Sequence, residues 1–377
     1  MGRKDGAERI VWPVGTAGWE ARAAEVLSPA VYDWLAGGAG EEWTLRANRS
    51  AFERWRLRPR MLTGNDRREA SVTVAGTRCP APFLLAPIGG QTLVHPEGEL
   101  ATAGASSATG VPLIVSTASS FGIEEIASRM GDTPFWYQLY WVDDRDVVES
   151  FVDRAVVSGC AAIVLTVDTP LMGSRDRDVR NDFAPARHGA GLGMYVSDDA
   201  FARRLTRPPE EDPEAVREEV ATITPHTHLT WADLGWLRAK TPLPLLVKGI
   251  LTAEDAIAAL DAGMNGVIVS NHGGRQLDGA VASLDALTEV RSALGDDATV
   301  LMDGGVRRGT DVVKALAAGA NAVLVGRPFM YGLAVAGRGG VEAVLGSLID
   351  DIDRTFALVG ARDVGSIGRS FIVEASG

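Results

Sequence analysis

The sequence is short of cysteine, of positive charge and of long hydrophobic runs. Cys79 and Cys160 are its only cysteines, which excludes a disulfide framework and is typical of a reducing cytoplasm. Lysine and arginine total 37 against 49 aspartate and glutamate residues, so the net charge is −12 and no nucleic-acid partner is expected. No uninterrupted apolar run approaches the roughly 20 residues of a membrane-spanning helix, so no membrane partner is expected.

Several signals that would direct the chain elsewhere are also missing. The opening MGRKDGAERIVW is charged throughout and lacks the apolar core of a secretory signal, and glycine at position 6 breaks the myristoylation pattern. There is no Walker loop, no Gly-x-Gly-x-x-Gly opening a helix and no cluster with metal-ligand spacing, so no metal site is expected. We therefore expect a soluble protein of the cytoplasm.

Eight short apolar runs recur along the chain. They are dominated by valine, isoleucine and leucine without polar alternation, the pattern of parallel strands that are covered on both faces. Segments with helical period, such as 253–263 and 309–320, lie between most of them. The runs cover residues 82–89, 111–117, 135–141, 161–168, 244–250, 266–273, 299–305 and 322–328.

This alternation predicts a single-domain α/β protein, a closed (β/α)8 TIM barrel spanning residues 1–377. The alternative is an open doubly wound sheet, which the equal repeats and the missing fingerprint glycines disfavour. Residues 1–80 contain a helix, a Gly-rich turn and a second helix, and we expect them to form an N-terminal helical cap on the barrel.

A long insert follows the fourth predicted strand. The chain runs from Asp168 to Pro244 before the next strand, and a connection of this length is usually functional or mobile. We predict that residues 170–230 form a lid over the C-terminal mouth of the barrel, where such folds keep their chemistry. The alternative is a disordered or oligomer-contacting loop.

The chain has only five histidines, and they differ in context. His272 stands where a strand leaves the core, at the edge of a Gly-rich loop. His226 and His228 alternate in the insert without a carboxylate or cysteine partner and are interpreted as surface residues. His95 is expected to begin a helix, and His188 has no assignable role.

Polar side chains interrupt the apolar runs at or near their C-terminal ends. Burying an unpaired polar group is costly, so each requires a partner or a ligand. A barrel gathers these strand ends around one axis, which predicts a single site there. The residues are Gln138, Tyr140, Thr166, Asp168, Lys248, Ser270, His272, Asp303 and Arg327.

Gly-rich turns follow the last two predicted strands. DGGVRRG (303–309) and GRP (326–328) place backbone amides beside Arg307 and Arg327, where barrels commonly bind phosphate. Glycine lets the backbone approach an anion, and arginine adds a planar bidentate grip.

The stretch SNHGGRQLDGA (270–280) resembles the active-site signature of the FMN-dependent α-hydroxy-acid oxidising family, which includes glycolate oxidase, lactate oxidase, lactate monooxygenase and mandelate dehydrogenase. The similarity runs through VYDWLAGGAGEEWTLRANR, HPEGE, YQLY, LTVDTP, KGI, DGGVRRG and GRP, which is nearly the whole chain. GSRDRDVRNDF (173–183) resembles the lactate oxidase branch in particular. The resemblance implies FMN-dependent oxidation of an L-2-hydroxy acid to a 2-oxo acid, with oxygen giving hydrogen peroxide and a tetramer as the expected assembly.

The resemblance also implies a role for each site residue. His272 would be the base, oriented by Asp168, while Lys248 stabilises reduced flavin. The substrate site would comprise Arg175, Arg275, Tyr140, His272, Trp34 and Gly89. The flavin ring would contact Pro87, Ile88, Gly89, Ser116, Gln138, Thr166, Lys248 and Ser270. The ribityl chain and phosphate would contact Asp303, Gly304, Gly305, Arg307, Gly326 and Arg327.

Two residues depart from the family pattern. Trp34 stands where the family usually has a tyrosine, and Ala118 stands where many relatives have an aromatic residue. One interpretation is a pocket reshaped for something bulkier than glycolate, and the other is local repacking with an unchanged substrate.

Other functions remain open at this stage. The substrate could lose its hydroxyl proton with hydride transfer, or its α-proton to give a carbanion. The product could be decarboxylated before release, as in lactate monooxygenase, or the substrate could be bulkier or carrier-bound. An isomerase or nucleotide-type dehydrogenase predicts a catalytic cysteine at a strand end, and neither cysteine is placed there. A flavin-binding barrel without turnover is the last alternative.

Overall fold

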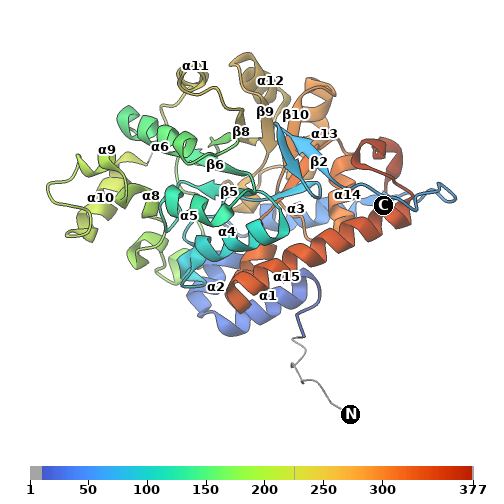
Figure 1. Cartoon of the computed structure of the whole chain (residues 1–377), viewed down its shortest axis with the longest axis horizontal. Coiled ribbons are helices and arrows are strands. Elements are labelled where there is room, and N and C mark those ends of the chain that lie inside the picture. The colour runs from blue at the N-terminus through green and yellow to red at the C-terminus, as the bar shows by residue number, and fades with distance from the viewer. Residues whose placement is uncertain (1–10, 225, 376–377) are drawn as a thin grey trace, which may run out of the picture.

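The computed structural model describes residues 11–224 and 226–375, and its centre is a closed barrel of eight parallel strands surrounded by helices (Figure 1). Around the barrel the order is β10-β11-β4-β5-β6-β7-β8-β9. The predicted barrel is confirmed and the open sheet is wrong. The strands are β4 (Phe83–Leu85), β5 (Leu113–Ser116), β6 (Phe135–Tyr140), β7 (Ile163–Thr166), β8 (Leu245–Ile250), β9 (Gly266–Val269), β10 (Thr299–Met302) and β11 (Ala322–Val325).

Helices follow the strands as the periodicity predicts. The helices expected at 253–263 and 309–320 are present and end slightly earlier than predicted. Thr252 shows why α12 begins where it does, because its hydroxyl accepts a hydrogen bond from the amide of Asp255 at 3.2 Å. The helices are α4 (Gly98–Thr109), α5 (Ile123–Met130), α6 (Arg145–Val157), α11 (Trp231–Lys240), α12 (Ala253–Asp261), α13 (Ser283–Leu294), α14 (Gly309–Ala317) and α15 (Arg327–Val359).

A layer of apolar side chains fills the barrel. Because side chains alternate between the two faces of a strand, the residue two positions further along each strand faces the interior again, one layer nearer the mouth. Most residues of this second layer are polar. The two-residue period of the strands therefore places polar side chains together at the mouth of the barrel. The lower layer is Leu84, Ile114, Trp136, Val164, Leu246, Ile268, Leu301 and Leu324. The layer above it is Ala86, Ser116, Gln138, Thr166, Lys248, Ser270, Asp303 and Gly326.

The N-terminal region is helical only in its first part. The helices α1 (Gly15–Val26), α2 (Pro29–Ala36) and α3 (Trp43–Glu53) agree with the predicted cap. The prediction is wrong for residues 55–79, which are irregular except for three short strands. There β1 (Trp55–Leu57) pairs antiparallel with β12 (Ile372–Glu374), and β2 (Val72–Val74) with β3 (Thr77–Cys79).

The β2–β3 hairpin packs on the apolar layer inside the barrel. Val74 and Cys79 belong to the same buried cluster as that layer. The indole nitrogen of Trp136 donates to the hydroxyl of Thr77 at 2.8 Å. The hairpin therefore covers the end of the barrel opposite the polar layer.

The insert after β7, which the sequence predicts to be a lid, is folded. It contains α7 (Asp176–Arg180), α8 (Gly193–Val196), α9 (Asp199–Ala202) and α10 (Pro213–Ile223). Tyr195 anchors it, with its ring 5.3 Å from that of Phe151 on α6 and 5.3 Å from that of Phe201. A disordered loop is therefore the wrong interpretation of its described residues, and an oligomer contact stays untested.

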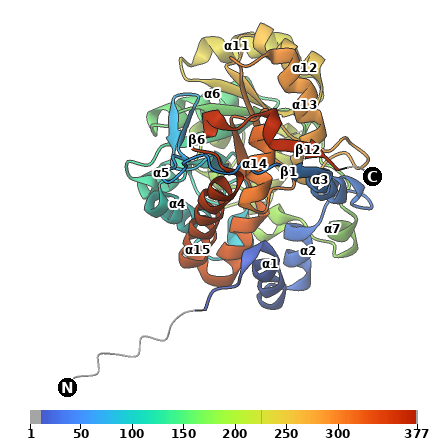
Figure 2. The ribbon, with the colours of Figure 1, turned by 90° about the vertical axis from the view of Figure 1, so that its right-hand side faces the viewer.

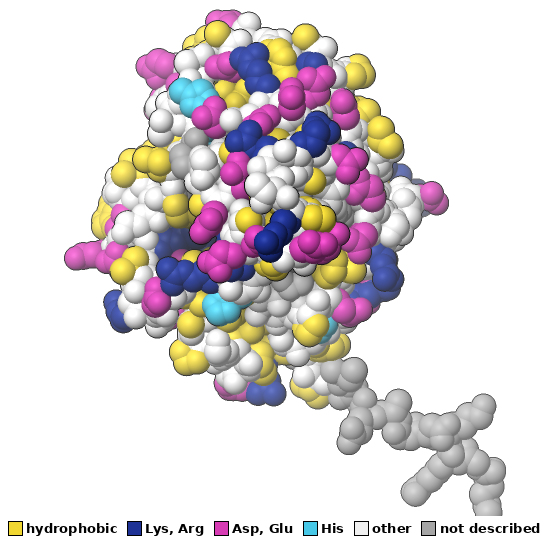
Figure 3. All heavy atoms as spheres, turned by 90° about the vertical axis from the view of Figure 1, so that its left-hand side faces the viewer, with side chains coloured by type: hydrophobic (Ala, Val, Ile, Leu, Met, Phe, Trp, Pro, Cys, Tyr) yellow, Lys and Arg dark blue, Asp and Glu magenta, His cyan; other side chains and the backbone are white. Residues whose placement is uncertain are grey.

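Two views place the lid relative to the rest of the chain. Figure 2 shows α7 beside α2, although more than a hundred residues separate them in sequence. Figure 3 faces the side that carries α8 to α10 and shows acidic, basic and apolar side chains intermixed rather than a patch of one charge.

The long helix α15 differs in its apolar character from what the sequence predicts. By length and composition alone it could cross a membrane, contrary to the expectation from uninterrupted apolar runs. However, Phe329, Leu345 and Phe356 are among its many buried residues, and the helix packs against α1, α4 and α14. Core helices of soluble proteins meet the same criteria. The backbone also breaks at Ala336 and Gly337. The lack of a membrane partner stays a prediction.

Candidate active site

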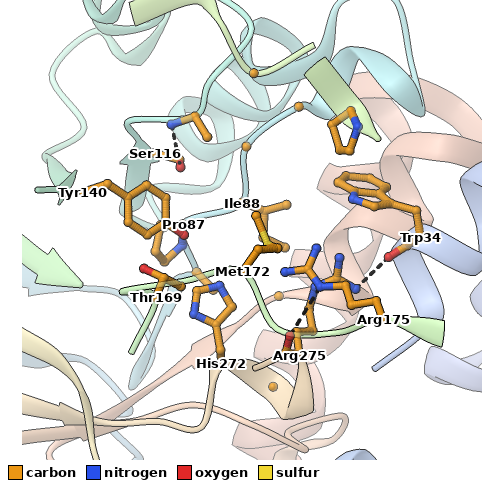
Figure 4. A pocket seen from close by; sticks show the side chains of 18 of the residues that line it. Trp34, Pro87, Ile88, Ser116, Tyr140, Thr169, Met172, Arg175, His272 and Arg275 are labelled. Carbon is orange, nitrogen blue, oxygen red and sulfur yellow. Dashed lines mark hydrogen bonds between the residues drawn. The ribbon is translucent and has the colours of Figure 1, made fainter. Parts of the chain in front are cut away.

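A cavity of about 590 Å³ opens at the C-terminal mouth of the barrel, between the strand ends, α2 and the lid (Figure 4). Four predicted residues lie just outside its lining, namely Gln138, Thr166, Asp168 and Ser270. The other predicted residues line it: Trp34, Pro87, Ile88, Gly89, Ser116, Tyr140, Arg175, Lys248, His272, Arg275, Asp303, Gly304, Gly305, Arg307, Gly326 and Arg327. The structure therefore brings together residues spread over nearly 300 positions of sequence.

The imidazole of His272 points into this cavity (Figure 4), and the carboxylate of Asp168 holds it. Its Nδ1 lies 2.9 Å from Oδ1 of Asp168. An ionised carboxylate only accepts, so Nδ1 carries the proton and the lone pair of Nε2 is free for a substrate proton.

The backbone of His272 adopts a conformation that residues other than glycine rarely adopt. Its φ is +57°, and such strain costs about 1–3 kcal/mol and persists only where neighbouring contacts impose it. The hydroxyl of Ser270 accepts from the His272 amide at 3.0 Å, which is one such contact.

A reciprocal amide pair, which the sequence did not suggest, provides the other contacts. Asn48 on α3 and Asn271 exchange two hydrogen bonds of 2.8 Å, and both side chains are buried. The side chain of Asn271 also accepts from the amide of Gly274 at 3.1 Å. The pair ties the turn that carries His272 to the N-terminal cap.

Burial and neighbouring charges set the protonation of the base and its partner. Burial lowers the pKa of His272, so the imidazole is neutral near pH 7. Burial alone would raise the pKa of Asp168, but the charge of His272 in its protonated form, the ammonium of Lys248 and the hydrogen bond from His272 outweigh it and lower that pKa. A neutral base therefore sits beside an ionised carboxylate that stabilises its protonated form.

Lys248 supplies the positive charge of the polar layer. Its Nζ donates to the Ser270 hydroxyl at 2.8 Å and lies 3.2 Å from Oδ2 of Asp303. Burial disfavours the ammonium, but the charges of Asp303 and Asp168 prevail and raise its pKa. Lys248 is therefore a fixed cation at the floor of the cavity.

Three buried polar atoms of this layer have no hydrogen-bond partner within the described chain: Nε2 of Gln138, Oγ1 of Thr166 and Oδ1 of Asp303. Such atoms are costly unless a ligand satisfies them. The carbonyl and N–H edge of an isoalloxazine ring and the hydroxyls of a ribityl chain have the complementary chemistry. The residues present therefore fit the polar parts of FMN.

Arg307 and Arg327 fit the remaining group of FMN, its phosphate. Neither forms an ion pair with any described residue, and Arg327 donates only to backbone carbonyls, those of Leu35, Gly37 and Gly273. Burial and the charge of Arg327 lower the pKa of Arg307 to about 10. Gly304 and Gly305, with φ of +92° and +87°, bring backbone amides close by. Two unpaired guanidinium groups in one place require an anion.

A second pair of arginines lies on the substrate side. Arg275 Nη1 donates to the carbonyls of Trp34 and Gly37 at 2.6 and 2.9 Å, and its guanidinium lies 5.7 Å from the Trp34 ring. Arg175 Nε donates to the carbonyl of Arg275 at 3.3 Å. Burial and the nearby charges of Arg175 and Arg327 lower the pKa of Arg275 well below its ordinary value. A substrate carboxylate bound here would offset the repulsion between these positive charges.

Other side chains complete the walls. Burial raises the pKa of Tyr140 to about 12, so its hydroxyl remains a neutral donor. Ala118 lines the cavity. Thr169 and Met172 also line it, and sequence analysis missed them because they follow a strand end without interrupting it.

The structure decides three of the histidine interpretations. His226 is buried, with Nδ1 3.0 Å from the carbonyl of Thr224, and it lines the cavity, so its assignment to the surface is wrong. Exposed His228 is confirmed as a surface residue. His95 lies three residues before α4 rather than at its start.

The comparisons with known proteins agree with this geometry. A family model described as FMN-dependent dehydrogenase matches residues 23–374. An L-lactate oxidase from Nostoc sp. is 42% identical over 96% of this chain and 98% of its own length. A 4-hydroxymandelate oxidase from Amycolatopsis orientalis is 43% identical over 94% of this chain and 97% of its own.

Solved structures lead to the same family. A crystal structure of mandelate oxidase matches with a TM-score of 0.86 and 41% identity, over 97% of this chain and 99% of that one. The chain belongs to the FMN-dependent dehydrogenase family, with FMN as its cofactor and oxidation of a hydroxy acid as its reaction.

Proposed function

We propose that the protein oxidises an L-2-hydroxy acid to the 2-oxo acid and that oxygen is the final electron acceptor. One observation carries the proposal. The neutral imidazole of His272, backed by Asp168, opens on the same cavity as the guanidinium groups of Arg175 and Arg275. A base and a carboxylate-binding pair are what a 2-hydroxy acid requires.

Each residue then has a defined task. Arg175 and Arg275 bind the substrate carboxylate, and Tyr140 donates a hydrogen bond to the substrate oxygen. His272 takes a proton from the substrate through Nε2, while Asp168 stabilises the imidazolium that results. Lys248 holds positive charge at the floor of the cavity.

FMN held by the residues described above would supply a two-electron acceptor that oxygen can reoxidise. The substrate thereby loses two electrons and two protons, and one oxygen molecule becomes hydrogen peroxide. The relatives named L-lactate oxidase and 4-hydroxymandelate oxidase support oxygen as the acceptor.

The test is a product balance with purified protein in air. We expect one 2-oxo acid and one hydrogen peroxide per substrate consumed, with the L enantiomer and not the D enantiomer of lactate. Carbon dioxide in place of peroxide would instead support the monooxygenase outcome. No product from any L-2-hydroxy acid by FMN-loaded protein would contradict the proposal.

We also propose a tetramer in the cytoplasm. Support comes from family resemblance for the assembly and from the two reduced, buried cysteines for the compartment. Light scattering coupled to gel filtration measures the mass, and a monomer of 39.8 kDa would contradict the assembly.

A further inference from the structure

The cavity continues beyond His272 toward the lid, past the residues with tasks in the proposed function. This outer part, which we call the lid chamber, is lined by Ala118, Leu171, Met172, Leu192, Val220 and Ala221. Its walls come from the loops after β5 and β7, the segment before α8, and α10.

Two large apolar side chains at the rim of the chamber are exposed to water. Leu171 is 58% exposed and Met172 is 73% exposed, although both face the cavity. Large apolar side chains at the rim of a concave site are typical of a surface that an apolar ligand covers. An apolar group seated in the chamber would remove them from water.

The inner wall of the chamber is built from closely packed backbone. Gly90 donates to the carbonyl of Ala118 at 2.9 Å, which ties the loop after β4 to the loop after β5. A Cβ at Gly89 would lie 2.1 Å from that same carbonyl, and one at Gly191 would lie 2.9 Å from it. The glycines therefore let these loops pack backbone to backbone, and Ala118 contributes only a methyl group to the lining of the chamber.

The charged groups at the chamber do not form a binding site for a second anion. Arg217 on α10 lines the outer edge, and its guanidinium lies 3.5 Å from the carboxylate of Glu214. Around the described cavity, the guanidinium groups without an ion pair are those of Arg275, Arg307 and Arg327, at the carboxylate and phosphate positions already assigned. Arg175 lies 3.9 Å from the carboxylate of Asp178. The chamber is thus suited to hydrocarbon rather than to a dicarboxylate.

We propose, resting on the function proposed above, that the lid chamber takes the substrate side chain and that the substrate is an L-2-hydroxy acid with a bulky apolar side chain, aryl or branched alkyl. Glycolate and lactate, whose side chains are a hydrogen and a methyl group, would leave the chamber unfilled. Specificity then depends on α10 and on Leu171 and Met172, none of which contacts the reacting atoms.

The first experiment compares substrates of identical chemistry at the reacting carbon. Anaerobic reduction of the FMN-loaded protein is followed by flavin absorbance with glycolate, L-lactate, L-2-hydroxy-4-methylpentanoate and (S)-mandelate. We expect kcat/KM to be at least 10-fold higher for the two bulky acids than for L-lactate. Equal or higher kcat/KM for glycolate or L-lactate would overturn the inference, whereas reduction by none of the four acids would overturn the proposed function instead.

The second experiment fills the chamber from α10. Ala221→Trp places an indole at a lining, solvent-reached position of the helix, so folding is not at risk. We expect kcat/KM for (S)-mandelate to fall at least 10-fold while that for L-lactate changes less than twofold. The matched control is Thr222→Trp, on an exposed neighbouring position outside the lining.

Binding without turnover gives an independent readout. Phenylacetate and acetate lack the 2-hydroxyl group and are titrated against the flavin absorbance of both tryptophan variants and the parent protein. We expect phenylacetate to bind at least 10-fold more tightly than acetate in the parent and in Thr222→Trp, and to lose this advantage in Ala221→Trp. An advantage that Ala221→Trp leaves intact would contradict the inference.

Discussion

Burial and neighbouring charges determine whether each titratable residue of the site is charged. His272 is neutral because burial lowers its pKa, whereas Lys248 stays charged because Asp303 and Asp168 outweigh the same effect. The site therefore holds both a neutral base and a fixed cation. That difference between two buried nitrogens leads to a pH prediction.

The first prediction concerns the partner of the base. Because the pKa of His272 is below its ordinary 6.5, the acid limb of kcat/KM lies below pH 6.5 in the parent protein. Asp168 raises that pKa, so Asp168→Asn moves the limb to still lower pH. It also removes the stabilisation of the imidazolium, and we expect a loss of roughly 10²- to 10⁴-fold in kcat. A pH profile of flavin reduction measures both effects, and an unmoved limb would contradict the assignment.

The second prediction concerns the two cysteines. Burial raises the pKa of Cys79 and of Cys160 to about 12, so neither thiol forms a thiolate at neutral pH. We expect a thiol reagent to label neither cysteine in the native protein and both after unfolding. Fast labelling of the folded protein at pH 7.5, measured by mass spectrometry, would contradict the burial of these two thiols.

The sequence predicts some residues of the site and not others. Asp168, Lys248 and His272 were predictable because polar residues at period two interrupt apolar runs. Asn48 was not, since its partner Asn271 is 223 positions away and nothing local marks it. His226 was misread because an insert without strands gives no pattern from which burial can be inferred.

At the scale of elements, the contact of α3 with the turn after β9 stabilises the strained base. The third prediction removes it with Asn48→Ala, which breaks both hydrogen bonds to Asn271 and leaves that side chain only its bonds to Gly274 and Val281. We expect a loss of about 1–3 kcal/mol in the free energy of unfolding, measured with urea, and a lower kcat. Ser50→Ala, at an exposed position of the same helix, is the control. Parent-like stability and kcat in Asn48→Ala would contradict the claim that the Asn48–Asn271 pair stabilises the turn of His272.

The elements also show why the sequence sufficed for the barrel but not for its N-terminal region. The eight barrel strands are marked by continuous apolar runs, because helices cover them outside and side chains fill them inside. The strands β1, β2 and β3 have three residues each, too few to show a period, and β1 depends on a partner at the far end of the chain. The lid was predicted from its length and position, while its short helices were not.

For the whole molecule, the unpaired arginines couple the fold to its cofactor. Arg307 and Arg327 repel one another until an anion lies between them, so the protein without FMN should be less stable. The fourth prediction is a gain of about 2.7 kcal/mol in the free energy of unfolding when FMN is present at 100 times its dissociation constant. Riboflavin, which lacks the phosphate, should stabilise less at equal concentration. Equal melting temperatures with and without FMN would contradict this coupling.

The most direct test of the central claim, that His272 takes the substrate proton in front of the flavin, is rapid-mixing spectroscopy of His272→Ala. We expect the variant to bind FMN as the parent protein does, and its flavin to stay oxidised when an L-2-hydroxy acid is added without oxygen. Bleaching at the parent rate in this variant would show that the imidazole is not the base.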